Sequence, residues 1–123
     1  MKHLQVGRKF SRTAKQRKAL MNGLLSQLIQ RGKINTTLAK AKELKKEAEA
    51  TVSKIKKAYA SEESMDIAKI RILKTVLSKN ITPADLKKIS QRFAKRNSGF
   101  TRLVRSGRRK SDSAEKAILE FID

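Results

Sequence analysis

The sequence predicts a small α+β protein, and three observations support that fold class. Over residues 13–93, apolar residues recur three or four positions apart, which is typical of helices with one buried face. Short runs rich in β-branched and aromatic residues lie near residue 35 and after residue 99, which is typical of strands. The length of 123 residues suits one domain with a thin core. We therefore expect a short sheet of about three strands packed by about four helices, with residues 1–10 as an extended basic arm and residues 11–123 as a single domain.

The first predicted helix lies between Thr13 and Gly32. Thr13 and Gln16 have the spacing of a capping box, in which each side chain accepts a hydrogen bond from the other residue's backbone N–H. Leucines at every fourth position of residues 20–28 predict one buried stripe, and Gly32 is typical of a helix end. Residues 33–37 are short and β-branched, and they predict a brief strand.

Two further helices are predicted in the middle of the chain. Thr37 can cap a helix that continues to about residue 60. Residues 61–64 predict a loop whose acids suit the start of the next helix, which ends near residue 80. The buried face of that helix is predicted from its spaced apolar residues, Ile67, Ile70, Leu73 and Leu77.

The start of the fourth helix is the clearest local signal in the sequence. Thr82 suits the N-cap, Pro83 the first helical position, and Asp85 the third. Residues 97–99, Asn-Ser-Gly, end this helical region.

The C-terminal region predicts a hairpin. Residues 100–105 and 117–122 are strand candidates, joined by a basic loop over residues 106–113. A helix is the alternative for residues 117–122, but the segment is short and densely apolar, which favours a strand.

Charge is the most unusual property of the chain. It has 31 Lys and Arg residues against 11 Asp and Glu, for a formal net charge of +20. Residues 1–42 contain 11 basic residues, residues 86–111 contain 10, and neither block contains an acid. Arginine, which can bind phosphate through two parallel hydrogen bonds, is concentrated in these blocks, with only Arg71 between them. The pattern favours binding of a polyanion, most simply a nucleic acid.

The composition excludes several kinds of site. There is no cysteine, so no disulfide framework or thiolate metal site exists, and His3 as the single histidine excludes a His-based triad. Tryptophan is absent and aromatic residues make up 4%, which argues against a base-stacking platform. No apolar run is long enough to span a membrane, and no secretory signal follows the basic N-terminus. We therefore expect no catalytic residue, metal or cofactor, no membrane association and no homo-oligomer.

Two other functions remain open from composition alone. A DNA-compacting architectural protein would share the size and charge, and it would bind duplex DNA as well as structured RNA. A protein of anionic membrane surfaces would use a basic amphipathic helix, although no helix here pairs bulky aromatic residues with a dense basic face.

Motifs along the chain resemble those of a known family, the bacterial-type large-subunit ribosomal protein seventeen. They are, in order, Gly7-Arg8-Lys9, Arg12-Thr13, Arg17-Lys18-Ala19-Leu20, the string from Thr36 to Leu44, Arg92-Phe93-Ala94, the string from Gly99 to Leu103, Gly107-Arg108-Arg109 and Asp112. The resemblance covers the chain apart from roughly residues 46–90. It implies a small mixed sheet flanked by helices, and a structural protein of the large ribosomal subunit, near the outlet of the nascent-chain tunnel. The implied partners are large-subunit ribosomal RNA and neighbouring ribosomal proteins. The implied location is cytoplasmic and ribosome-bound in a bacterium, although an organelle-encoded protein would look the same.

We expect the RNA contacts to come from the basic residues of the two blocks. RNA duplexes hide their base edges in a narrow major groove, so a small basic domain contacts phosphate, ribose and shape. The candidate RNA-binding residues are Lys2, His3, Arg8, Lys9, Arg12, Lys15, Arg17, Lys18, Lys40, Lys42, Arg92, Lys95, Arg96, Arg102, Arg105, Arg108, Arg109 and Lys110.

Some conspicuous residues have a structural interpretation. Glu43, Glu47 and Glu49 are expected to form solvated salt pairs on one helix rather than a metal or acid–base site. Phe100 is expected to be a core residue of a strand rather than a base-stacking residue.

Overall fold

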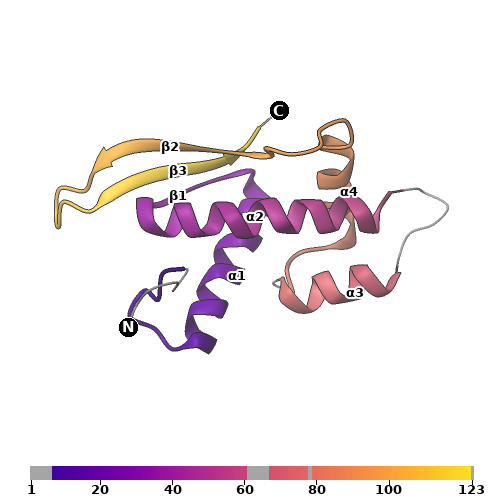
Figure 1. Ribbon diagram of the computed structural model, residues 1–123, viewed down its shortest axis with the longest axis horizontal. Helices are drawn as coiled ribbons and strands as arrows, with labels where there is room; N and C mark the ends of the chain where they lie inside the picture. Colours follow the sequence, from indigo (N-terminus) through magenta and orange to yellow (C-terminus); the bar gives the residue numbers. More distant parts are fainter. Residues whose placement is uncertain (1–6, 61–66, 78, 123) are drawn as a thin grey trace.

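The computed structural model describes residues 7–60, 67–77 and 79–122, and it confirms the α+β class. Figure 1 shows a sheet on one side of the molecule, with helix α2 beneath it and α1 and α3 farther away. In chain order, the elements are α1 (Ala14–Arg31), β1 (Lys33–Thr37), α2 (Leu38–Ala58), α3 (Ile67–Val76), α4 (Pro83–Arg92), β2 (Thr101–Arg108) and β3 (Glu115–Phe121).

The sheet is antiparallel in the described chain, whereas the resemblance implies a mixed sheet. The strand order is β1-β3-β2, with β3 in the centre and antiparallel to both neighbours. Because β2 and β3 form a hairpin, their pairing must be antiparallel. Strand β1 joins the other edge of β3 and runs parallel only to β2, which it does not touch, so no parallel pair forms.

Helix α2 is the centre of the core. Ala41, Leu44, Ala48, Ile55 and Ala58 have no exposed surface, because the helix lies between the sheet and the other helices. At this spacing of three, four or seven residues, the apolar side chains share one face of the helix. A sequence of small and large apolar residues at those positions thus forms the face of α2 on which the rest of the core packs.

Three phenylalanines close the end of the core near the C-terminus. Phe93 contacts Phe100 and Phe121 edge to face, with ring centroids 5.2 and 5.5 Å apart. Phe100 is 1% exposed, which confirms that it is a core residue.

The helix ends follow the predicted local chemistry. Thr13 and Thr82 both form complete capping boxes, and Gly32 ends α1 in the left-handed conformation at φ 79°. The carbonyl of Gly32 accepts a hydrogen bond from the backbone N–H of Phe121, which ties the end of α1 to the sheet. Thr37 occupies the N-cap of α2, but its side chain makes no cap hydrogen bond.

The hairpin strands are longer than predicted. Arg108 pairs with Glu115, so the turn covers residues 109–114 instead of 106–113. A β-bulge between Arg105 and Gly107 absorbs one extra residue, and Gly107 has φ 99°, which a residue with a side chain rarely adopts. Serine and glycine are not typical strand residues, so the sequence pattern did not predict that the strand continues past the bulge.

Helix α3 is shorter and more exposed than predicted. It ends at Val76 rather than near residue 80. Leu73 and Leu77 are buried and Ile70 is partly buried, but Ile67 is 60% exposed. The predicted acidic loop at residues 61–64 lies outside the described residues. None of the helices in the described segments is both long and apolar enough to cross a membrane.

Candidate nucleic-acid interface

Three basic segments meet around the first turns of α2. They are the end of the N-terminal arm, the start of α2 itself and the tip of the β2–β3 hairpin, all at one end of the molecule (Figure 1). Three hollows in the surface lie in succession around the start of α2, and cations line each of them. We call this region the α2-start surface and define it by Arg8, Arg17, Lys18, Lys40, Lys42, Arg109 and Lys116.

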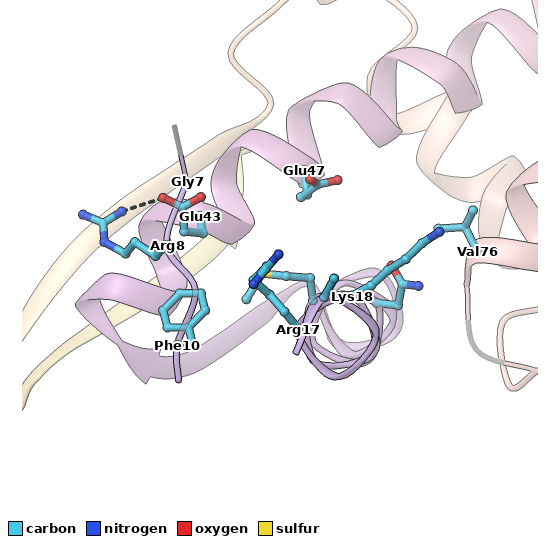
Figure 2. A pocket seen from close by; sticks show the side chains of 11 residues that line it. Gly7, Arg8, Phe10, Arg17, Lys18, Glu43, Glu47 and Val76 are labelled. Carbon is cyan, nitrogen blue, oxygen red and sulfur yellow. Dashed lines mark hydrogen bonds and ion pairs between the residues drawn. The ribbon is translucent and has the colours of Figure 1, made fainter. Parts of the chain in front are cut away.

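The arm is fastened to α2 by an ion pair. A guanidinium nitrogen of Arg8 lies 2.6 Å from Glu43 Oε1, and Glu43 is mostly buried beneath it. The chain then turns at Phe10 and Ser11, which both have positive φ angles, and enters α1. Figure 2 shows Arg8 on Glu43, with Arg17 of α1 beside the same hollow. Glu43 thus holds the described part of the arm against the start of α2.

The start of α2 carries cations without carboxylate partners. Lys40 lines a hollow of about 460 Å³ together with Ser106 and Arg109 of the hairpin and Lys116 of β3. Lys42 lines a second hollow with Arg8. Neither Lys40 nor Lys42 has an ion pair with a carboxylate of the described chain. Their charges are therefore available to an anion.

The first turns of α1 and α2 contain no acidic residue. Acids are the usual choice there, because the helix dipole places partial positive charge at the N-terminus. Helix α4 follows that rule with Asp85. The helices at the α2-start surface instead carry Lys15, Arg17 and Lys40, so positive charge accumulates at positive helix ends.

The hairpin turn is held in shape by one aspartate. Asp112 accepts hydrogen bonds from the Arg109 guanidinium, at 2.6 and 3.0 Å, and from the backbone N–H of Ala114. The Arg109 hydrogen bond is the largest cause that lowers the pKa of Asp112, so the carboxylate is ionised at neutral pH. Lys110 and Arg105 are exposed and have no carboxylate partner in the described residues. The turn thereby presents Lys110 at the tip of the hairpin, and Arg105 lies farther along β2, opposite Ala117.

The basic residues of the second block, residues 86–111, lie at separate places in the structure. Arg105, Arg108, Arg109 and Lys110 lie on the hairpin at the α2-start end. Arg92 is the last residue of α4, and Lys95 and Arg96 follow it, at the other end of the sheet.

Arg92 and Arg96 have structural contacts of their own. Arg92 donates to the Phe121 carbonyl at 3.3 Å and lies over the rings of Phe93 and Phe121. Arg96 donates to the Gly99 carbonyl at 3.1 Å. Both side chains therefore support the C-terminal end of the core.

The other predicted contact residues are placed as follows. Lys9 and Arg12 precede α1, and Lys15, Arg17 and Lys18 lie on its first turns; of these, Arg17 and Lys18 line the hollow with Glu43 of α2. Arg102 is bound to Glu120 across the sheet, and Arg108 lies 3.9 Å from Glu115. Lys2 and His3 lie outside the described residues.

The sequence did not predict one residue of the site, Lys116, nor the contacts of Glu49 in the middle of α2. Lys116 was not a candidate, yet it lines the hollow with Lys40; strand alternation with the buried Ala117 could have placed it on the opposite face. Glu49 was expected to form a solvated salt pair, which is wrong. Its carboxylate accepts hydrogen bonds from the backbone N–H groups of Phe100 and Thr101 and from the Thr101 hydroxyl, at 2.7–3.1 Å.

Comparison with known proteins gives one consistent family. A family model described as "Ribosomal protein L17" matches residues 20–122. A large ribosomal subunit protein bL17 of Thermodesulfovibrio yellowstonii is 43% identical, over 100% of this chain and 88% of the relative. The bL17 proteins of Pelagibacter ubique and Ehrlichia chaffeensis are 37% and 36% identical, over 100% of this chain and 81% and 91% of their own lengths.

Proposed function

The chain belongs to the ribosomal protein L17 family and is a structural constituent of the large ribosomal subunit, and from this premise we propose that it binds the RNA of that subunit, mainly through the α2-start surface. The observation that supports this proposal is the convergence of arm, helix start and hairpin tip, which are far apart in the sequence. Segments with an excess of basic residues that meet at one end of a chain of net charge +20 form the kind of surface that phosphates neutralise.

The proposed mode of binding follows from the shape of the surface. The hollow beside Lys40 is lined by Lys, Arg, Thr and Ser side chains, which donate hydrogen bonds to phosphate and ribose oxygens, and the hollow beside Lys42 combines Arg8 and Lys42 with Glu115. The arm and the hairpin stand on either side of the helix start. An RNA backbone that crosses there would contact both basic blocks of the sequence at once.

The remaining predicted basic residues have different proposed roles. Lys2, His3, Lys9, Arg12 and Lys15 extend the contact along the arm and α1. Arg92, Lys95 and Arg96 form a separate, smaller contact near the C-terminal end, and Arg102 mainly orients Glu120. Residues 1–10 act as the arm and residues 11–123 as one RNA-binding domain. No enzymatic activity is part of the proposal, in keeping with a ribosomal protein family.

A salt titration of RNA affinity tests the proposal. If about eight phosphates are neutralised, the logarithm of affinity for large-subunit RNA should fall with the logarithm of salt concentration with a slope of roughly −6 to −7. Lys40→Ala with Lys42→Ala should weaken binding and flatten the slope by roughly 1.5.

The matched control lies on the same helix. Lys54→Ala with Lys57→Ala removes the same charge from the other half of α2, and it should leave the slope within about 0.3 of the wild-type value. Equal effects of the two pairs would contradict the assignment to the α2-start surface, and a flat salt response would contradict the electrostatic mode. Equal competition by duplex DNA would favour the alternative, a DNA-compacting architectural protein.

We also propose that the protein lies near the nascent-chain exit of cytoplasmic ribosomes, beside other large-subunit proteins. The family resemblance supports this location. Because the chain has no cysteine, Lys110→Cys gives a single attachment point for an iron chelate that cleaves nearby RNA. Cleavage clustered around the tunnel outlet is expected, and cleavage confined to other regions would contradict the location.

A further inference from the structure

Helix α3 exposes apolar side chains that the core does not use. Ile72 is 65% exposed, and Val76, which borders the hollow between the arm, α1 and α2, is 39% exposed. The two residues are four positions apart, so they lie on one side of α3, one turn from each other. Exposed apolar residues that adjoin in this way are typical of an interaction site.

The exposed side of α3 borders a groove against the second half of α2. The groove is a hollow of about 170 Å³ lined by Lys54 and Lys57 of α2 and by Lys69, Ile72 and Leu73 of α3. We call it the α3 groove. Its floor is apolar, its rim consists of lysines, and no acidic residue among residues 7–60, 67–77 and 79–122 lines it.

We propose that the α3 groove binds a segment of a neighbouring protein that presents apolar side chains flanked by carboxylates. The charge of the groove indicates this partner: Lys54 and Lys57 are exposed and have no carboxylate partner in the part of the chain that the structure describes. An acidic segment neutralises Lys54 and Lys57, and its apolar residues cover Ile72.

RNA and membranes fit the groove less well. A phosphate backbone would neutralise the lysines but would leave the apolar floor without apolar contacts. Helix α3 has 10 residues and no aromatic side chain, whereas helices that lie in a membrane surface usually carry bulky aromatic anchors. The proposal is independent of RNA binding, because the groove lies on the other half of α2 from Lys40 and Lys42.

Photo-crosslinking in assembled large subunits tests this proposal. Ile72 is replaced by a photo-crosslinking amino acid in the full-length chain, and co-sedimentation with large subunits is measured first. The expected product is a crosslink to a peptide of another ribosomal protein that contains apolar residues between Asp or Glu residues. Lys54→Glu with Lys57→Glu should lower the yield of that product by roughly tenfold.

Two controls separate the possible outcomes. Ile67 has nearly the same exposure but lies roughly 140° around the helix from Ile72, so a crosslinker there should not give the same product. Lys79→Glu with Lys87→Glu makes the same change in net charge outside the groove and should leave the yield unchanged.

Several results would overturn the proposal. A crosslink only to RNA, to the same chain or to a second copy would do so. A crosslink to a peptide without Asp or Glu would also do so, as would the absence of any crosslink from a variant that co-sediments. Binding of the wild-type protein, but not Ile72→Asp, to phosphatidylglycerol vesicles would assign the groove to a membrane instead. Failure to co-sediment would contradict the ribosomal function itself, not the groove assignment alone.

Discussion

Glu49 joins two parts of the chain that are 52 positions apart. From the middle of α2 it accepts three hydrogen bonds where the chain enters β2, two of them from backbone N–H groups. Burial raises the pKa of Glu49, but the hydrogen bonds from Thr101 and from the backbone of Phe100 together lower it by more, so the pKa lies below its ordinary value of 4.5. This carboxylate therefore anchors the hairpin to the helix.

Replacing Glu49 should destabilise the protein in a pH-dependent manner. Glu49→Ala leaves buried N–H groups without acceptors, so the free energy of unfolding should fall by about 1–3 kcal/mol at pH 7 in urea titrations. Because the folded-state pKa is depressed, the stabilisation is complete above pH 4.5 and is lost as the pH falls through the folded-state value. The difference between wild type and variant should thus shrink in acid.

Glu47→Ala is the matched control for Glu49. Glu47 is exposed on the same helix, so its replacement should change stability by less than about 0.5 kcal/mol. Equal losses for Glu47→Ala and Glu49→Ala, or a difference independent of pH, would contradict the anchoring role.

At the scale of the elements, the helix starts differ in how they are capped. The Thr82 hydroxyl accepts a hydrogen bond from the backbone N–H of Asp85, and the Asp85 carboxylate accepts one from the N–H of Thr82. These hydrogen bonds lower the pKa of Asp85. Helix α2 has no such arrangement at Thr37.

This difference predicts unequal effects of the same substitution. Thr82→Ala should reduce the free energy of unfolding by about 1 kcal/mol, because it removes a cap hydrogen bond. Thr37→Ala should reduce it by less than about half as much, because no cap hydrogen bond is lost. Chemical denaturation of both variants measures the pair, and a larger loss for Thr37→Ala would refute the assignment of the caps.

The elements also show which structure the sequence could predict. The capping boxes at Thr13 and Thr82 depend on residues three positions apart, and both were predicted from the sequence and confirmed. The antiparallel pairing of β1 with β3, the bulge near Ser106 and the contacts of Glu49 depend on residues far apart in the chain. Local patterns carry no information about such contacts, and they were missed.

The candidate site shows the same limit. The sequence identified two basic blocks, but it could not show that the hairpin half of the second block joins the first at the start of α2. Nor could it show that Arg92 and Arg96 would lie apart, with contacts to the backbone carbonyls of Phe121 and Gly99. Charge counts give the chemistry of a surface, while chain topology decides its position.

At the scale of the whole molecule, the charge of +20 opposes folding in the absence of RNA. Salt screens this repulsion, so the Tm of the free protein should rise between low and moderate NaCl, by roughly 4 °C for each kcal/mol relieved. RNA affinity should fall over the same range. Differential scanning calorimetry and RNA binding in matched buffers measure the two trends. A Tm that falls with salt would show that charge repulsion does not limit stability.

The length of α2 has a consequence for how the protein would work within an assembly. The helix has 21 residues and is about 30 Å long. Lys40, at the end proposed to bind RNA, and Lys54, at the α3 groove, are about 21 Å apart along its axis. Because the helix is packed along its length against the sheet and the other helices, it cannot bend easily. The protein would thus act as a rigid spacer. The length of α2 would fix the distance between the bound RNA phosphates and a docked protein segment.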